Sequence, residues 1–209
     1  MPAGNGETMY IEFFGLPGAG KSTFAEIFNQ SKNVDAKLSI SALFKIFLSY
    51  SRFLSLIVYK FFTSFSTILY FFKRPYHFFG FLKGFLVRLI IIHRHQDSGY
   101  FIQDHGLAQM LTQNDYWRKE FVNDKKFLHN MIRIFPKQKA IIYIYLKSNK
   151  KISVSRTVQR DRKRLFSDAF LKETEIIFEE AKKYLNAKPV KTNATRKEIL
   201  KSFKELLPK

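Results

Sequence analysis

The chain contains no cysteine, and this absence excludes several kinds of protein at once. Without thiols there can be no disulfide framework, no thiolate zinc site and no cysteine nucleophile, and the composition suits a reducing compartment. Residues 1–8 also lack the basic and apolar regions of a signal peptide. The sequence therefore predicts a cytoplasmic protein.

Acidic residues are scarce overall and are absent from one long segment. The 209 residues include 36 Lys and Arg against 17 Asp and Glu, which gives a formal net charge of +19. Such a charge favours polyanionic partners, such as nucleic acid, anionic lipid, nucleotides or phosphorylated glycans, but does not indicate a fold. Residues 36–96 hold nine of the basic residues, no Asp or Glu, and twelve of the 24 Phe.

The chain does have enough apolar residues, 46%, for one domain over residues 1–209 with an insertion at 36–96. Short β-branched and aromatic runs predict strands at residues 9–14, 99–103, 140–146 and 189–192. Helical patterns occur at residues 22–30, 41–67, 78–92, 107–134, 152–165, 169–185 and 196–207, with a break at Arg74-Pro75. Strands that alternate with helices predict an α/β fold with a mostly parallel sheet covered on both faces.

Residues 15–22 read Gly-Leu-Pro-Gly-Ala-Gly-Lys-Ser and match the pattern G-x-x-x-x-G-K-[ST]. In that pattern the glycines expose successive backbone N–H groups to phosphate oxygens. Lys21 would reach the β- and γ-phosphates, and the Ser22 hydroxyl would bind Mg²⁺. The alternative is a glycine-rich turn that precedes a helix by chance, but the strand before it and the helix after it favour phosphate binding. The predicted ATP-binding residues are Gly15, Gly18, Ala19, Gly20, Lys21, Ser22 and Thr23, and GTP stays open as the donor.

This motif, continued by Thr23, resembles that of the P-loop kinases of small molecules, the group that holds nucleoside-monophosphate, shikimate and gluconate kinases. The resemblance covers most of the chain outside residues 36–96. It implies a three-layer P-loop NTPase fold and transfer of the γ-phosphoryl group of ATP, with Mg²⁺, to a small acceptor. It also implies that Asp104, after a predicted strand, supports Mg²⁺ or takes the proton of the attacking hydroxyl. The alternative role for Asp104 is to cap the next helix, and His105 is interpreted as a local contact.

The resemblance further implies a lid over residues 147–168, whose arginines would neutralise charge on the transferred phosphoryl group. The candidates are Arg156, Arg160 and Arg162. Arg156 and Arg160 are four residues apart and so share a helix face, whereas Arg162 lies on another. The alternative is a solvated basic helix face. Asn193, after the last predicted strand, would border the adenine.

Two departures from known motifs reduce the number of possible substrates and protein classes. Thymidylate kinases of this group usually have Asp-Arg-aromatic where this chain has Asp104-His105-Gly106, which puts thymidylate in doubt. A regulatory GTPase needs Asn-Lys-x-Asp, but Asn149-Lys150 is followed by Lys and Ile, so a GTPase is not favoured.

In nucleotide kinases, the segment that corresponds to residues 36–96 builds the acceptor site. Four interpretations are open: a packed core, an interfacial surface on an anionic membrane, a transmembrane span at residues 53–72, or a nucleic-acid surface. Lys60 inside the apolar run disfavours a span. The aromatic residues form one wide face instead of a few platforms, which disfavours nucleic acid. The core and membrane-surface interpretations can each be correct for part of this segment.

Three functions follow from these observations. The first is a kinase for a nucleotide, nucleoside, sugar or glycan acceptor, which could act in solution or at a membrane surface. The second is a non-catalytic or slowly hydrolysing nucleotide switch that binds a membrane or a partner. The third is a polynucleotide kinase or nucleic-acid-stimulated ATPase. The acceptor and the oligomeric state are left open by the sequence.

Overall fold

The computed structural model describes residues 9–28, 39–94, 100–103, 105–137, 141–160 and 166–192. Four strands in these ranges form one parallel sheet: β1 (Met9–Gly15), β2 (Tyr100–Gln103), β3 (Ile141–Lys147) and β4 (Lys188–Lys191). Their order across the sheet is β2-β1-β3-β4, so β1 has a neighbour on each side. The four predicted strands are confirmed to within one or two residues. The helix predicted over 196–207 lies outside the described residues.

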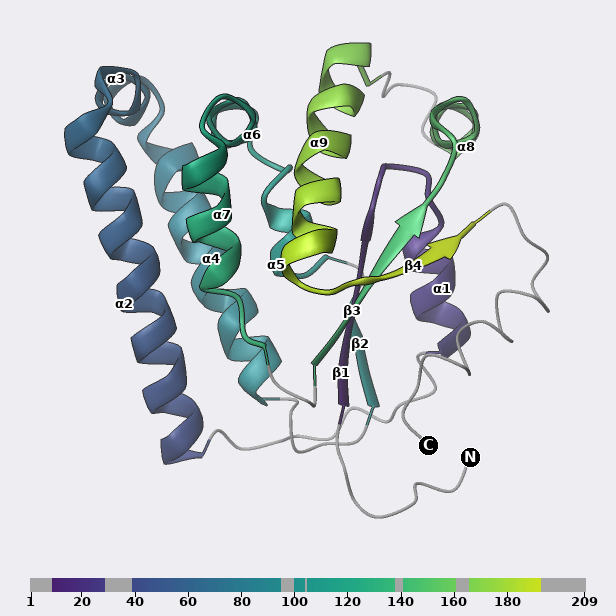
Figure 1. Ribbon diagram of the computed structural model, residues 1–209, viewed down its shortest axis with the longest axis horizontal. Coiled ribbons are helices and arrows are strands. Elements are labelled where there is room, and N and C mark those ends of the chain that lie inside the picture. The colour runs from purple at the N-terminus through teal and green to yellow at the C-terminus, as the bar shows by residue number, and fades with distance from the viewer. Residues whose placement is uncertain are drawn as a thin grey trace.

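Helices lie on both sides of this sheet (Figure 1). The side chains of β1 alternate between two cores: Ile11 and Phe13 pack with Phe24 of α1, whereas Tyr10 and Phe14 join the larger core on the other face. Because both faces are covered, β1 is apolar along nearly its whole length. The α/β class with a parallel sheet is confirmed and is compatible with three layers. The helices are α1 (Lys21–Phe28), α2 (Ile40–Thr63), α3 (Phe65–Lys73), α4 (Pro75–Arg94), α5 (Leu107–Met110), α6 (Asp115–Asn123), α7 (Lys125–Arg133), α8 (Lys150–Arg160) and α9 (Asp168–Tyr184).

The break at Arg74-Pro75 is confirmed, but the unbroken helix predicted over residues 41–67 is wrong. Ser64 adopts an extended backbone, with φ −134° and ψ 109°, and separates α2 from α3. The turn brings α3 against α6, where the Thr67 and Tyr116 hydroxyl oxygens are 2.7 Å apart. The rings of Tyr70 and Tyr116 also stack, with centroids 4.1 Å apart. Contacts with a distant helix thus override a local periodicity that contains no proline or glycine.

Helix α2 lies at the outer edge of the molecule, and α4 lies between it and the sheet (Figure 1). Two contacts hold α2 in this place. The buried rings of Phe53 and Phe85 stack with centroids 4.0 Å apart. The Lys60 ammonium group lies 3.0 Å from the carboxylate of Glu120 and 3.0 Å from that of Asp124. Helix α2 is therefore fastened to both α4 and the α6–α7 pair.

The aromatic insertion is divided between core and surface. Four of its twelve Phe are buried and six are exposed. The exposed ones are Phe44, Phe47, Phe62, Phe65, Phe72 and Phe79. By length and composition alone, α2 and α4 could each cross a membrane, with 22% and 28% of their most apolar windows buried. Core helices of soluble proteins pass the same test, so only the contacts of these helices can decide their role.

Replacing one buried and one exposed Phe of α2 should show, by the loss of stability, which face of the helix packs in the core. We expect Phe53→Ala to lower the free energy of unfolding by about 3–5 kcal/mol, because it empties a ring-sized space beside Phe85. Phe62 is 78% exposed, so Phe62→Ala should change the free energy of unfolding by less than about 0.5 kcal/mol. Urea denaturation followed by circular dichroism measures both, and equal losses would contradict this assignment of faces.

Candidate functional site

The predicted phosphate-binding loop, residues 15–22, begins at the carboxyl end of β1, with Gly15 as the last residue of the strand and Lys21 as the first of α1. From β1 the chain goes to β2 on one side, and it then crosses to β3 on the other. Open parallel sheets bind ligands at such a switch point, outside the carboxyl ends of the strands. Gly18 and Gly20 have φ of 76° and 88°, backbone conformations that other residues rarely adopt. The loop therefore combines a switch-point position with left-handed glycines, and its binding of phosphate stays a prediction.

Helix α8 packs directly on this loop. A Cβ at Gly18 would lie 2.3 Å from the carbonyl oxygen of Ser153 and 2.8 Å from the hydroxyl oxygen of Thr157, both on α8. The Thr157 hydroxyl donates to the same Ser153 carbonyl at 2.8 Å, which fixes its position. A helix predicted as part of a lid thus lies against the loop, and only a glycine fits between them.

Lys21 folds back over the loop from the start of α1. Its ammonium group donates to the carbonyl oxygens of Gly15 and Leu16 at 2.8 and 2.9 Å, and the residue is only 7% exposed. A full positive charge is therefore held inside the loop. Around it, Ala19 is buried, Ser22 is half-buried and Thr23 is exposed. Contact between these residues and a nucleotide stays a prediction.

Glu12 is a site residue that the sequence reasoning missed. Its buried carboxylate accepts hydrogen bonds from the backbone N–H groups of Leu107 at 3.0 Å and Ala108 at 2.7 Å, at the start of α5. Burial raises the pKa of Glu12 from 4.5 to about 7, against the opposing effect of the backbone hydrogen bonds and of Arg88. A Cβ at Gly106 would lie 2.1 Å from Glu12 Cδ, so the carboxylate fills the space beside that glycine. The available signal was an acidic residue inside an otherwise apolar strand.

Two further polar side chains hold the residues after β2 in place. The Gln109 side-chain oxygen accepts from the backbone N–H of Gly15 at 3.4 Å. The Arg88 guanidinium of α4 donates to the backbone carbonyls of His105 and Gly106 at 2.9 and 3.1 Å. The chain after β2 is thus held by α4 on one side and by β1 on the other. The interpretation of the His105 side chain as a local contact stays a prediction.

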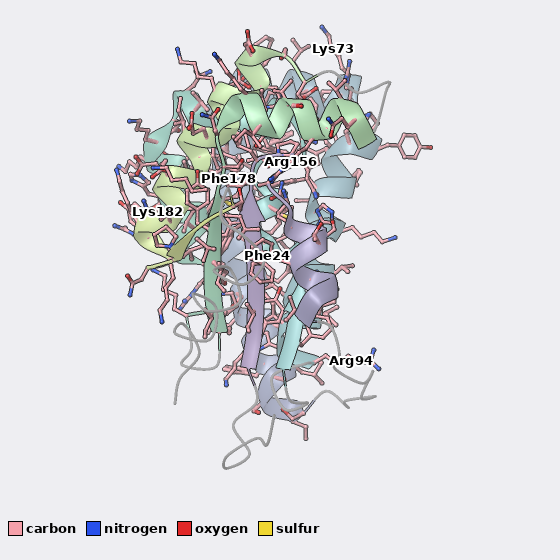
Figure 2. The ribbon with its side chains drawn as sticks, turned by 90° about the vertical axis from the view of Figure 1, so that its right-hand side faces the viewer. Phe24, Lys73, Arg94, Arg156, Phe178 and Lys182 are labelled. Carbon is pink, nitrogen blue, oxygen red and sulfur yellow. The ribbon has the colours of Figure 1, made fainter. Side chains whose placement is uncertain are left out.

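The remaining predicted site residues are placed only in part. Arg156 is exposed on α8, and in Figure 2 it lies beneath that helix near the carboxyl end of β1. Arg160 is the last residue of α8, and its side chain lies outside the described part of the chain, as do Asp104, Arg162 and Asn193. Among the described residues there is no group of three or more His, Asp or Glu side chains that could hold a metal. The magnesium site of Ser22 and Asp104 stays a prediction.

A pocket of about 510 Å³ opens between α3 and α4 on one side and the α5–α6 region on the other. Met110 lines this pocket, and its neighbour Gln109 contacts Gly15, so the pocket and the loop lie close to opposite sides of α5. The lining is cationic, aromatic and hydrogen-bonding. Its polar members are Arg74, Arg88, Lys119, His77, Tyr70, Tyr76, Tyr116, Gln113, Asn114 and Asp115. The sequence pointed to residues 36–96 for such a site but missed the wall formed by residues 110–119.

Comparisons with models of known protein families and with curated proteins give no match to this chain.

Adding one methyl group at each of two glycines should test the contact between α8 and the loop. Gly18→Ala should destabilise the protein by about 2 kcal/mol or more, because it combines a left-handed backbone with a clash against Ser153. At Gly80, inside α4, a Cβ would meet nothing within 4 Å. Gly80→Ala should therefore stabilise the protein by about 0.5–1 kcal/mol. Urea denaturation measures both changes, and a harmless Gly18→Ala would mean that α8 does not pack on the loop.

Glu12 should make stability depend on pH in an unusual direction. A raised pKa in the folded state means that folding takes up a proton between about pH 4.5 and 7. The contribution of Glu12 to stability should therefore be greatest below about pH 4.5 and fall by about 3 kcal/mol as the pH rises to about 7. Glu12→Gln should remove most of this slope. Urea midpoints between pH 5 and 8 test this, and identical slopes for both proteins would refute the assignment.

Proposed function

We propose that the protein is a cytoplasmic phosphotransferase that moves the γ-phosphoryl group of ATP to a small acceptor bearing hydroxyl or phosphate groups. The observation that carries the proposal is the loop of residues 15–22. It lies at the switch point of a parallel sheet and has two left-handed glycines, with a buried lysine across it. A loop whose close contacts exclude side chains can bring backbone N–H groups near phosphate oxygens.

The donor would bind in the loop with its triphosphate toward α1. Lys21 would exchange its two carbonyl partners for phosphate oxygens of the β- and γ-groups. The Ser22 hydroxyl, in the first turn of α1, would hold Mg²⁺ together with Asp104, which follows the last residue of β2. The metal would neutralise charge on the phosphates. Asn193 would lie beside the adenine.

The acceptor would bind in the pocket between α3, α4 and the α5–α6 region. Arg74, Arg88 and Lys119 favour an anionic group there, and the phenol and amide groups suit hydroxyls. This chemistry fits a nucleotide, a sugar phosphate or a phosphorylated glycan. Because Arg88 also binds the carbonyls of His105 and Gly106, the pocket borders these two residues, which follow Asp104 in the sequence.

In the proposed transfer, the acceptor oxygen forms a bond to the γ-phosphorus as the bond to the β–γ bridging oxygen breaks, and ADP leaves. The proton of the acceptor hydroxyl passes to the Asp104 carboxylate where that group acts as the base, and to water where it supports Mg²⁺ instead. Arg156 on α8, with Arg160 and Arg162, would offset the charge that develops on the transferred group. Since α8 rests on Gly18, this helix is suitably placed to supply that charge.

Replacement of Lys21 and Asp104 should separate donor binding from transfer. Lys21→Ala should abolish measurable affinity for ATP with Mg²⁺, whereas Asp104→Asn should keep the affinity and lower the transfer rate at least about a hundredfold. Lys172→Ala, an exposed lysine of α9, is the matched control. Calorimetry measures the affinity, and ADP release with a panel of nucleosides, nucleotides and sugar phosphates measures the rate.

Three results would contradict parts of this proposal. If no ribonucleotide binds to the unmodified protein, the loop is not a nucleotide site. An unchanged rate in Asp104→Asn would remove the role assigned to that carboxylate. ADP release that is equal with every acceptor would favour a nucleotide switch over a kinase.

A further inference from the structure

Exposed large apolar side chains are gathered on one side of the protein. Among the described residues, fifteen large hydrophobic side chains are exposed, and fourteen of them belong to α2, α3 and α4. The fifteenth is Val158 of α8. We call the fourteen the outer face: Ile40, Leu43, Phe44, Phe47, Leu48, Val58, Tyr59, Phe62, Phe65, Leu69, Phe72, Tyr76, Phe79 and Val87.

Helix α2 shows why this face is more than a poorly covered core. It has two apolar stripes with helical spacing. One stripe contains Ile46, Phe53 and Ile57, each at most 6% exposed, and packs inward. The other follows Phe44, Phe47 and Phe62 along the opposite side, each at least 66% exposed. The contacts among the described residues use only the first stripe, so the second is left without a partner in that part of the chain.

The charges around the outer face indicate which occupant fits. Lys45 and Arg52 are exposed on α2 and lie seven residues apart, so they share one side of the helix. Lys73, Arg74 and Lys83 are exposed on α3, at the α3–α4 junction and on α4. Residues 36–96 contain no Asp or Glu at all. A broad apolar face to which its own helices add cations and no acids is complementary to anionic lipid.

We propose that the outer face docks on the surface of a membrane that contains anionic lipid. The aromatic side chains would enter the headgroup boundary, and the cations would meet lipid phosphates. A second copy of the chain fits less well, because a twofold contact sets the same patch against itself. The cations of one copy would then meet cations of the other, with no acidic side chain in residues 36–96 to pair with them.

Contacts on the inner side keep α2 on the surface of the membrane instead of across it. A span would have to break the pairs between Lys60 and the carboxylates of Glu120 and Asp124. It would also separate the stacked rings of Phe53 and Phe85. Burying unpaired charges in lipid is costly, so the contacts that fasten α2 favour docking in the plane of the membrane.

Vesicle sedimentation with the full chain tests the proposal. The protein should bind vesicles of phosphatidylcholine with phosphatidylglycerol, bind pure phosphatidylcholine far more weakly, and lose affinity as salt rises. Lys45→Gln should weaken binding about fivefold, and Phe62→Ser about tenfold or more. The matched controls are Lys172→Gln on α9 and Val158→Ser on α8, which should each change binding less than about twofold. Urea denaturation checks that Phe62→Ser is folded.

Several outcomes would overturn the docking surface. One is equal weakening by Lys45→Gln and Lys172→Gln, which would indicate diffuse attraction of a basic protein. Absence of vesicle binding would overturn it too. So would a concentration-dependent dimer that Phe62→Ser abolishes without any vesicle binding, which would assign the outer face to a second copy. None of these measurements uses nucleotide, so they leave the proposed kinase activity to its own tests.

Discussion

The carboxylate of Glu12 lies in the middle of the central strand, and the backbone N–H groups of Leu107 and Ala108 both donate to it. This contact fixes α5 against β1, and the other features of the site depend on where α5 lies. Gln109 on α5 then bonds to the first glycine of the loop. Met110, the next residue, forms part of the pocket wall. The loop and the pocket are thus positioned by one buried acid.

The sequence predicted the features that depend on short stretches of chain. The strand at 140–146 is a continuous apolar run, the strand at 9–14 is apolar except for Glu12, and the loop is a contiguous motif. All three could be identified without knowledge of the rest of the chain. The break at Ser64 could not, because it arises from contacts between α3 and Tyr116, about fifty residues away. Glu12 was missed for the same reason, since its partners follow a different strand. The site positions of Asp104, Arg162 and Asn193 are still predictions.

The insertion shows how one sequence segment can serve two environments. Periodicity predicted an amphipathic helix over residues 41–67, but apolar residues on two faces cannot be divided into inner and outer by spacing alone. Lys60 illustrates the difficulty. In the sequence it only interrupts an apolar run and has no visible partner, whereas in the structure it is buried and paired with Glu120 and Asp124. Whether Lys60 faces inward or outward depends on the position of its partners Glu120 and Asp124, which only the fold determines.

The Lys21 ammonium group is satisfied by two carbonyl oxygens of its own loop, and this has a consequence for selectivity. An anion that binds in the loop would have to replace these two carbonyl oxygens as partners of Lys21. Its binding free energy would therefore include only the difference between the new contacts and the old ones. A small monovalent anion offers little beyond those oxygens, whereas a chain of phosphates presents several charged oxygens at once. If the loop binds phosphates as we propose, this competition would favour a polyphosphate over small monovalent anions.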